Sequence, residues 1–303
     1  RAWTQPGNFV GNGPFILTRW QPHQRIVVRR NPLYASAARI ALDEIDFVAF
    51  DNDDTEERAY RSGQVDVTIK LPVTKIAVYA RDRPGELHHA PLAETRYLAF
   101  NTRRPPLNDE RVRRALALAL DRQKLVERVV LGGQEPAGRF LPPALRPRTE
   151  TDLPEDSTMR FDPAEARRLL AAAGFADGRG MRQLEITAWS PSQTAVLEAI
   201  QAMWKTELGI EVLLAIREGN VHFAALRSGD FDIGFSTAIP DVADAFDVLQ
   251  NFTSHAPGNY PHWSDARYDA LLSQAALTGD PAPRAELCRE AEVRLVQLFP
   301  VPP

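Results

Sequence analysis

Short runs of alternating apolar and polar residues dominate the first third of the chain. Successive side chains of a strand point to opposite faces of a sheet, so such runs predict strands. The strands predicted in this way are residues 15–19, 25–30, 44–50, 65–69 and 95–101. Two stretches of helical length, residues 53–62 and 73–81, lie between them. Acidic residues in the first turn and Gly63 after the last turn support the first helix.

Helical periodicity takes over after residue 101. The stretch PPLNDERVRRALALALDRQKLVERVV predicts one long amphipathic helix that starts at Asn108 as its N-cap. Residues 132–155 contain proline and glycine too densely for a regular element and predict a long surface loop or arm. Asp162 as cap and Pro163 at the first helical position predict the next helix, which ends at Gly174.

Strands and helices then follow one another in turn. The predicted strands are residues 184–189, 211–216 and 231–236, and the predicted helices are residues 192–208, 221–228, 241–252, 265–277 and 283–298. This order is typical of the α/β class, in which helices pack on both faces of a parallel or mixed sheet. The final residues, FPVPP, show no partner strand in the sequence.

Composition narrows the class of protein. A chain of 303 residues has room for about two domains, and a net charge of -4 gives no field that would attract nucleic acid. The basic cluster at residues 111–122 interleaves with acids and predicts a solvated face. The single cysteine, Cys288, excludes an internal disulfide, and its helical pattern predicts a packing role. No run approaches the roughly 18 apolar residues that cross a bilayer.

The beginning of the sequence has neither an initiator methionine nor the basic and apolar regions of a signal peptide. We therefore expect a processed or excised fragment. Motifs of catalysis are also missing, since the sequence contains no GxSxG, HExxH or Walker pattern. His88 and His89 are adjacent and would point to opposite faces of a strand, which makes a poor chelate. We expect no enzyme activity, no metal and no cofactor.

Several segments carry a resemblance to a known family. They are WTQPGNFVGNGPFILTRW, RIVVRRNPLY, AYRSGQVDV, YLAFNTRRPPLNDERVRRALALALDR and RSGDFDIGFSTAIPDVADAFDVL. Together, from residue 3 to residue 302, they resemble the peptide and nickel binding components of ABC importers (solute-binding family 5), and most closely the oligopeptide-binding members. The resemblance implies a periplasmic-binding-protein-like fold of type II, with two hinged lobes. Residues 1–95 would be part of the first lobe, and residues 96–303 most of the third domain, in the second lobe.

The resemblance also implies a function. Members bind a ligand in a cleft between the lobes and deliver it to the membrane-embedded permease of an ABC importer. For this chain we expect a short peptide ligand, a periplasmic or other extracytoplasmic location, a monomer, and no nucleic-acid partner. Other ligands of the family stay open as alternatives, namely a dipeptide, a murein peptide, a nickel chelate or a sugar. An α/β enzyme is the remaining alternative.

The same resemblance implies a set of site residues. Asp241 takes the place of the family's aspartate that pairs with the peptide's terminal ammonium, although an aspartate there could equally cap the helix that follows. Main-chain groups just upstream and a strand crossing between the domains would complete the site: Thr237, Ala238, Ile239 and Pro240, with Thr95, Arg96 and Tyr97. The sequence departs from the oligopeptide pattern at Ala238, Ile239 and Phe235, where that pattern has tryptophan, cysteine and arginine. No contact to a peptide carboxylate is therefore carried over to Phe235.

Overall fold

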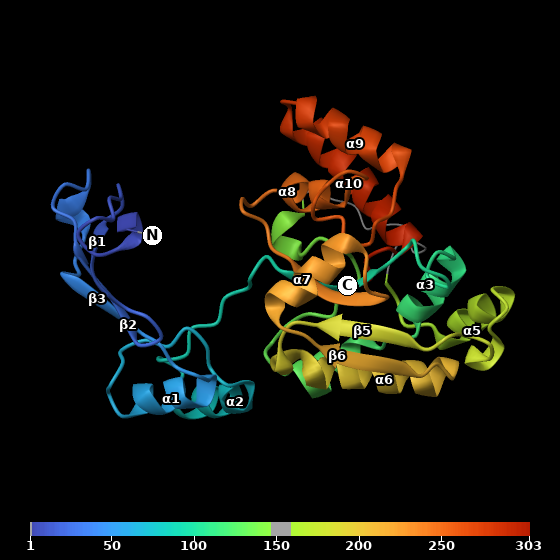
Figure 1. Cartoon of the computed structure of the whole chain (residues 1–303), viewed down its shortest axis with the longest axis horizontal. Helices are drawn as coiled ribbons and strands as arrows, with labels where there is room; N and C mark the ends of the chain where they lie inside the picture. Colours follow the sequence, from blue (N-terminus) through green and yellow to red (C-terminus); the bar gives the residue numbers. More distant parts are fainter. Residues whose placement is uncertain (1, 147–158) are drawn as a thin grey trace. The chain divides into compact units, whose positions relative to one another are not determined.

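A computed structural model describes residues 2–146 and 159–303 of the chain (Figure 1). The chain forms two compact units, Arg1–His88 and His89–Pro303, each with its own strands and helices. Within the described ranges, none of the helices combines the length and the apolar character that crossing a bilayer requires. The assignment of residues 1–95 and 96–303 to two lobes of a larger receptor stays a prediction.

The first unit contains a three-stranded antiparallel sheet and two helices. The strands lie in the order β1-β2-β3, and Trp20, Ile26 and Phe47 are cross-strand neighbours on one face. The elements are β1 (Phe15–Gln21), β2 (Arg25–Arg30), β3 (Glu44–Val48), α1 (Asp53–Arg61) and α2 (Val73–Asp82). The three strands and two helices predicted from the sequence are therefore confirmed.

The strand predicted at residues 65–69 is wrong. Apolar and polar residues alternate in this stretch, but no strand in the described part of the chain pairs with it. The side chains of Val67 and Ile69 are 80% and 87% exposed, and the N–H of Ile69 donates to Glu56 Oε1 at 2.7 Å. Alternation produces a strand only where a neighbouring strand supplies hydrogen bonds, and the sequence does not reveal that neighbour.

The second unit is built on a four-stranded mixed sheet with the order β4-β7-β5-β6. Its strands are β4 (Thr95–Phe100), β5 (Leu184–Ala188), β6 (Val212–Ile216) and β7 (Ile233–Ala238). β5 is parallel to both β6 and β7, whereas β4 is antiparallel to β7. The α/β class and the mixed sheet predicted from the order of elements are confirmed.

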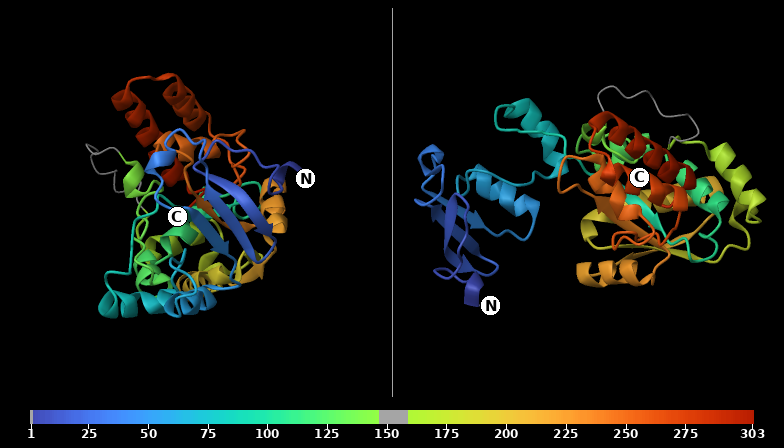
Figure 2. Two further views of the ribbon diagram at one scale, coloured as in Figure 1. Left: turned by 90° about the vertical axis from the view of Figure 1, so that its left-hand side faces the viewer. Right: turned by 90° about the horizontal axis from the view of Figure 1, so that it is seen from above.

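Helices cover both faces of this sheet, and β4 shows the division. Leu98 and Phe100 belong to one apolar core, while Tyr97 and Ala99 belong to the other. Figures 1 and 2 show α6 on one side of the sheet and the adjacent helices α9 and α10, in red, on the opposite side. The helices are α3 (Glu110–Leu118), α5 (Pro163–Ala172), α6 (Thr194–Leu208), α7 (Gly219–Ser228), α8 (Ala245–Leu249), α9 (Ala266–Leu277) and α10 (Pro281–Leu298).

The long helix predicted after residue 108 is broken into three pieces. α3 ends at Leu118, and α4 (Arg122–Leu125) and the single π-helical turn η3 (Val126–Val130) follow it. The N-cap of α3 is Asp109 rather than Asn108, because the Asp109 carboxylate accepts the N–H of Arg111 at 2.9 Å. Asp121 caps α4 in the same way by accepting the N–H of Lys124 at 3.0 Å. A second cap within an apolar periodic stretch therefore restarts the helix.

Two arginines of the basic cluster are buried, which contradicts the predicted solvated face. Arg113 donates to the carbonyl oxygens of Leu107 at 2.9 Å and Leu298 at 2.8 Å. Arg122 donates to the carbonyl oxygen of Ala117 at 3.1 Å, and burial lowers its pKa to about 10, so it stays protonated at neutral pH. Backbone carbonyls at the ends of helices and loops, rather than acidic side chains, accept the hydrogen bonds of these two guanidinium groups, while Nη2 of Arg122 is buried without a partner among the described residues.

The predicted surface arm at residues 132–155 is partly packed into the core. Phe140, Leu141 and Leu145 are buried, and the only regular element up to residue 146 is the short 3-10 turn η4 (Pro143–Leu145). Residues 147–155 lie outside the described residues. The dense prolines and glycines prevent a long helix or strand here, but apolar side chains between them still pack into the core that contains Tyr97 and Ala99.

The final residues do have a partner strand, contrary to the expectation for FPVPP. The N–H groups of Leu98 and Phe100 in β4 donate to the carbonyl oxygens of Pro302 at 2.9 Å and Pro300 at 3.0 Å. The segment therefore lies along the β4 edge of the sheet. Proline has no N–H and gives no strand signal in the sequence, yet its carbonyl can still accept from a neighbouring strand.

Gly209 gives a testable prediction for stability. It follows α6 with a φ of +69°, and a Cβ there would lie 2.5 Å from the carbonyl oxygen of Asp177. We expect Gly209→Ala to lower the free energy of unfolding by roughly 1–3 kcal/mol, since the left-handed conformation and the clash both add strain. Urea denaturation measures this. The matched control is Gly219→Ala in α7, where a Cβ meets open space, and equal losses in both variants would contradict the argument.

Candidate functional site

Antiparallel pairing of β4 with β7 brings together most of the residues expected in the site. Thr95 lies opposite Ala238, Arg96 opposite Thr237, and Tyr97 opposite Ser236. The sequence positions are about 140 residues apart, so the sheet rather than the local sequence creates this neighbourhood. The chain leaves β7 at Ala238 and continues through Ile239 and Pro240 to Asp241.

The side chains of Thr95 and Tyr97 turn into the core. The Thr95 hydroxyl donates to the carbonyl oxygen of Phe140 at 2.7 Å. The Tyr97 ring, only 3% exposed, makes edge contacts with Phe140 and Phe252 at centroid distances of 5.5 and 5.6 Å. Burial raises the pKa of the Tyr97 phenol and keeps it neutral. Neither side chain therefore faces solvent, although both were expected to line the cleft.

Arg96 has the opposite orientation. Its side chain is half-exposed, and its Nε lies 3.2 Å from Glu94 Oε1. Neighbouring residues of a strand alternate between the two faces, which explains why Arg96 differs from Thr95 and Tyr97. Of the three strand residues, Arg96 alone presents its side chain outward.

The end of β7 and the residues that follow it offer mainly their backbone. Thr237 and Ala238 are partly buried, whereas Ile239 is 56% exposed. Within the described ranges, no hydrogen bond reaches the main chain of Ile239. Pro240 has no N–H to donate. The C=O and N–H of Ile239 are thus available to an extended ligand, in the manner of strand addition.

Asp241 is exposed and does not begin a helix. Its N–H donates to Asp247 Oδ2 at 2.7 Å, and among the described residues its carboxylate has no hydrogen bond or ion pair. α8 starts at Ala245 and is capped by Asp244, which accepts the N–H of Phe246 at 2.9 Å. The helix predicted at residues 241–252 is present as α8 and the 3-10 turn η8 (Gln250–Phe252), but its predicted start at residue 241 and the capping alternative for Asp241 are wrong.

The charges near Asp241 are unbalanced. Asp244 forms an ion pair with Arg284 at 2.8 Å. Burial alone would raise the pKa of Asp244, but the hydrogen bonds from Arg284 and from the N–H of Phe246 outweigh it and lower the pKa. Within the described part of the chain, neither Asp241 nor Asp247 has a cationic partner. Two neighbouring carboxylates without a counter-charge favour a cationic group on a ligand.

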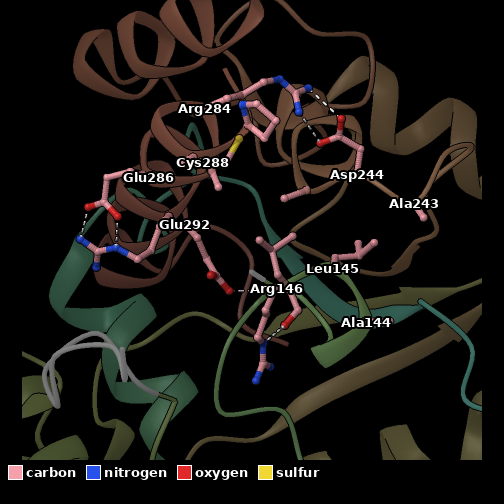
Figure 3. Close-up of a pocket in the computed structure, with 15 residues that line it drawn as sticks. Ala144, Leu145, Arg146, Ala243, Asp244, Arg284, Glu286, Cys288 and Glu292 are labelled. Atoms are coloured by element: carbon pink, nitrogen blue, oxygen red, sulfur yellow. Dashed lines mark hydrogen bonds and ion pairs between the residues drawn. The ribbon is translucent and has the colours of Figure 1, made fainter. Parts of the chain in front are cut away.

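A second feature, which the sequence did not predict, is a hollow of about 620 Å³ beside the turn at residues 243–245 (Figure 3). Figure 3 shows Arg284 and Asp244 facing each other near Cys288. Burial raises the pKa of the Cys288 thiol to about 11, so the thiol is protonated at neutral pH and a poor nucleophile. The packing role predicted for Cys288 is confirmed, since its side chain is 3% exposed.

The described residues contain no cluster of metal-ligating side chains. In the ranges 2–146 and 159–303, no three His, Cys, Asp or Glu side chains come together in a way that could hold a metal ion. His222 of α7 is fully buried and bonded to Phe235 O at 3.0 Å and Thr187 Oγ1 at 3.2 Å.

Comparison with known proteins identifies the family. Residues 1–260 match the family described as bacterial extracellular solute-binding proteins, family 5 middle, and the chain therefore belongs to this family. The resemblance found in the sequence motifs is thereby confirmed. The chain spans a little over half the length of the curated relatives it matches.

Two curated relatives illustrate the range of names. The probable deoxycholate-binding periplasmic protein YgiS of Escherichia coli is 35% identical over 304 residues, which cover 100% of this chain and 56% of YgiS. The periplasmic oligopeptide-binding protein OppA of Salmonella typhimurium is 30% identical over 298 residues, covering 97% of this chain and 54% of OppA. Both are named as binding proteins rather than enzymes.

A solved structure supports the fold. The murein tripeptide binding protein MppA of Escherichia coli is similar with a TM-score of 0.84 and 28% identity, over 100% of this chain and 60% of that chain. The chain has the fold of the periplasmic binding proteins over the part that it covers.

Proposed function

We propose that this chain is part of an extracytoplasmic receptor that binds short peptides and delivers them to the permease of an ABC importer. The observation that carries the proposal is the exposed carboxylate of Asp241, which has no partner among the described residues and follows directly on a segment with free main-chain groups. The carboxylate would pair with the peptide's ammonium, and the backbone of Ile239 would bond its main chain.

The second part of the proposal is that two lobes close around the peptide. In the full-length receptor, residues 1–95 would belong to the first lobe, and the site at Asp241 would belong to the second. Closure of the lobes around the peptide would exclude water and strengthen the ion pair, because a charge-assisted bond gains strength in a lower dielectric. Arg96, exposed beside Thr237 across the strand pair, would lie at the rim of the site. The receptor would act as a monomer, without nucleic acid.

A bile salt is the second candidate, because the relative YgiS is named as probably deoxycholate-binding. Deoxycholate carries a carboxylate and would bring a negative charge toward Asp241 and Asp247. Like charges within a few ångström oppose binding. The local charge therefore favours the ammonium of a peptide over the anion of a bile salt.

Thermal denaturation of the full-length protein tests the proposal. We expect tri-alanine at about one hundred times its Kd to raise Tm by roughly 3–5 °C, since a ligand that binds only the folded state stabilises it. N-acetylated tri-alanine, deoxycholate, a nickel–histidine chelate, a murein tripeptide and a simple sugar complete the panel. If one of the non-peptide ligands raised Tm and free-amine peptides did not, the proposal of a peptide ligand would be wrong and that ligand would take its place. Turnover of model esters, peptides or phosphates would instead support the α/β enzyme.

A further inference from the structure

Three aromatic rings from separate parts of the second unit form a connected group. Trp189 follows β5, Phe223 lies on α7, and Tyr260 lies in the loop before α9. The ring centroids of Trp189 and Phe223 are 5.3 Å apart, and those of Phe223 and Tyr260 are 6.2 Å apart. All three side chains are only partly buried. We call these three residues the aromatic shelf.

The shelf lies at the same end of the sheet as the segment that leads to Asp241. β5 is parallel to β7, with Thr187 opposite Gly234, so Trp189 falls beside the last residues of β7. Its ring lies 5.8 Å from that of Phe235. Figure 1 shows α7 next to the arrowhead that marks the carboxyl end of β5. Asp241 follows Ala238 by three residues, at most about 11 Å of extended chain.

The layer beneath the shelf is neutral and fully bonded. His222 contacts Trp189 and Phe223 at centroid distances of 5.5 and 5.0 Å. Its Nε2 donates to the carbonyl oxygen of Phe235, which leaves Nδ1 to accept from the Thr187 hydroxyl. Burial lowers the pKa of His222 and keeps the ring uncharged at neutral pH. The shelf therefore offers an apolar surface without a charge of its own.

Exposed aliphatic side chains also lie on both sides of Asp241 in the sequence. Ile239 is 56% exposed and Val242 is 59% exposed. The carboxylate therefore lies between exposed apolar neighbours in the sequence, on the segment that leaves β7 at the end where Trp189 lies. A ligand that complements these features carries both a positive charge and a large apolar group.

We propose that the aromatic shelf receives the first side chain of the bound peptide and that the receptor prefers peptides whose first residue is aromatic. This inference rests on the proposed function, because it assumes that the ammonium lies at Asp241. The ammonium and the first side chain leave the same Cα, so in a peptide held by Asp241 that side chain would lie at the end of the sheet that carries the shelf. Offset or edge-on ring contacts then add to the burial of apolar surface.

Calorimetric titration of the full-length protein with Phe-Ala-Ala and Gly-Ala-Ala tests the inference. We expect Phe-Ala-Ala to bind roughly 5–10-fold more tightly, in line with the strength of aromatic pairs. In Phe223→Ser the ratio should fall below about twofold, while the affinity for Gly-Ala-Ala stays nearly the same. Trp189→Leu, which keeps an apolar surface but removes a ring, should give an intermediate ratio.

The matched control is Phe161→Ser, because Phe161 is 41% exposed and contacts Lys124 rather than the shelf. It should keep the full preference for Phe-Ala-Ala. If the unmodified protein bound Phe-Ala-Ala and Gly-Ala-Ala equally well, the role of the aromatic shelf would be wrong. If Asp241 were still required for binding in that case, the proposed function would remain. Binding of deoxycholate with no binding of either peptide would overturn both.

Discussion

Replacement of Asp241 by alanine in the full-length receptor is expected to weaken the binding of free-amine peptides by about 2–5 kcal/mol. The carboxylate has no partner among the described residues, so the unliganded protein loses nothing that holds its own fold together. When the receptor closes on a peptide, however, the ammonium would be desolvated without a counter-charge. The loss arises mainly from that unpaired buried charge.

Two comparisons make the Asp241 prediction specific. Calorimetry with N-acetylated peptides should show a far smaller loss, because these peptides carry no ammonium. Asp230 precedes β7 at the opposite end from Asp241 and pairs with Arg104 on the surface at 2.9 Å, so Asp230→Ala should leave peptide affinity unchanged. If free-amine and acetylated peptides lost affinity equally in Asp241→Ala, the assigned role would be wrong.

Replacement of Trp204 by alanine is expected to cost roughly 3–5 kcal/mol of unfolding free energy, the largest effect on stability that we predict. Trp204 on α6 is fully buried within the core that contains Leu98 and Phe100, and its ring lies 6.5 Å from that of Phe100. Its indole N–H also donates to the carbonyl oxygen of Leu116 at 2.8 Å. The substitution therefore leaves both a large cavity and an unsatisfied buried carbonyl.

Urea denaturation followed by circular dichroism measures the effect at Trp204. Trp204→Phe keeps much of the volume but not the hydrogen bond and should give an intermediate loss. Trp20→Ala serves as the control, because that side chain is 41% exposed and leaves little cavity. A loss below about 1 kcal/mol in Trp204→Ala would show that the surrounding side chains close the cavity.

Local signals were sufficient for most of the elements. Asp162 accepts the N–H of Glu165 at 2.9 Å and starts α5 as predicted, because capping depends on residues within one turn. The long helix after residue 108 was not predicted correctly, since its apolar periodicity continues through the break and hides the second cap at Asp121. The buried positions of Arg113 and Arg122 depend on distant carbonyls and could not be predicted from charge spacing.

The side-chain orientations in the site also depend on residues that are distant in the sequence. The family motifs lead to the segment from Thr237 to Asp241, but they do not specify which face of β4 carries which side chain. The inward orientation of Tyr97 follows from packing against Phe140, which lies in a stretch with no strand or helix signal. The aromatic shelf joins three residues that are far apart in the chain, so no local pattern could predict it.

The proline-rich segment along β4 also affects how separate molecules meet. Of the residues Pro300–Pro303, only Val301 has an N–H group. A row of free donors and acceptors at the rim of a sheet would otherwise recruit a strand from another molecule and start an aggregate. Pro300, Val301 and Pro302 are themselves buried, and their carbonyl oxygens take up the N–H groups of Leu98 and Phe100. The segment therefore covers the β4 edge, and that edge cannot recruit a strand from another molecule.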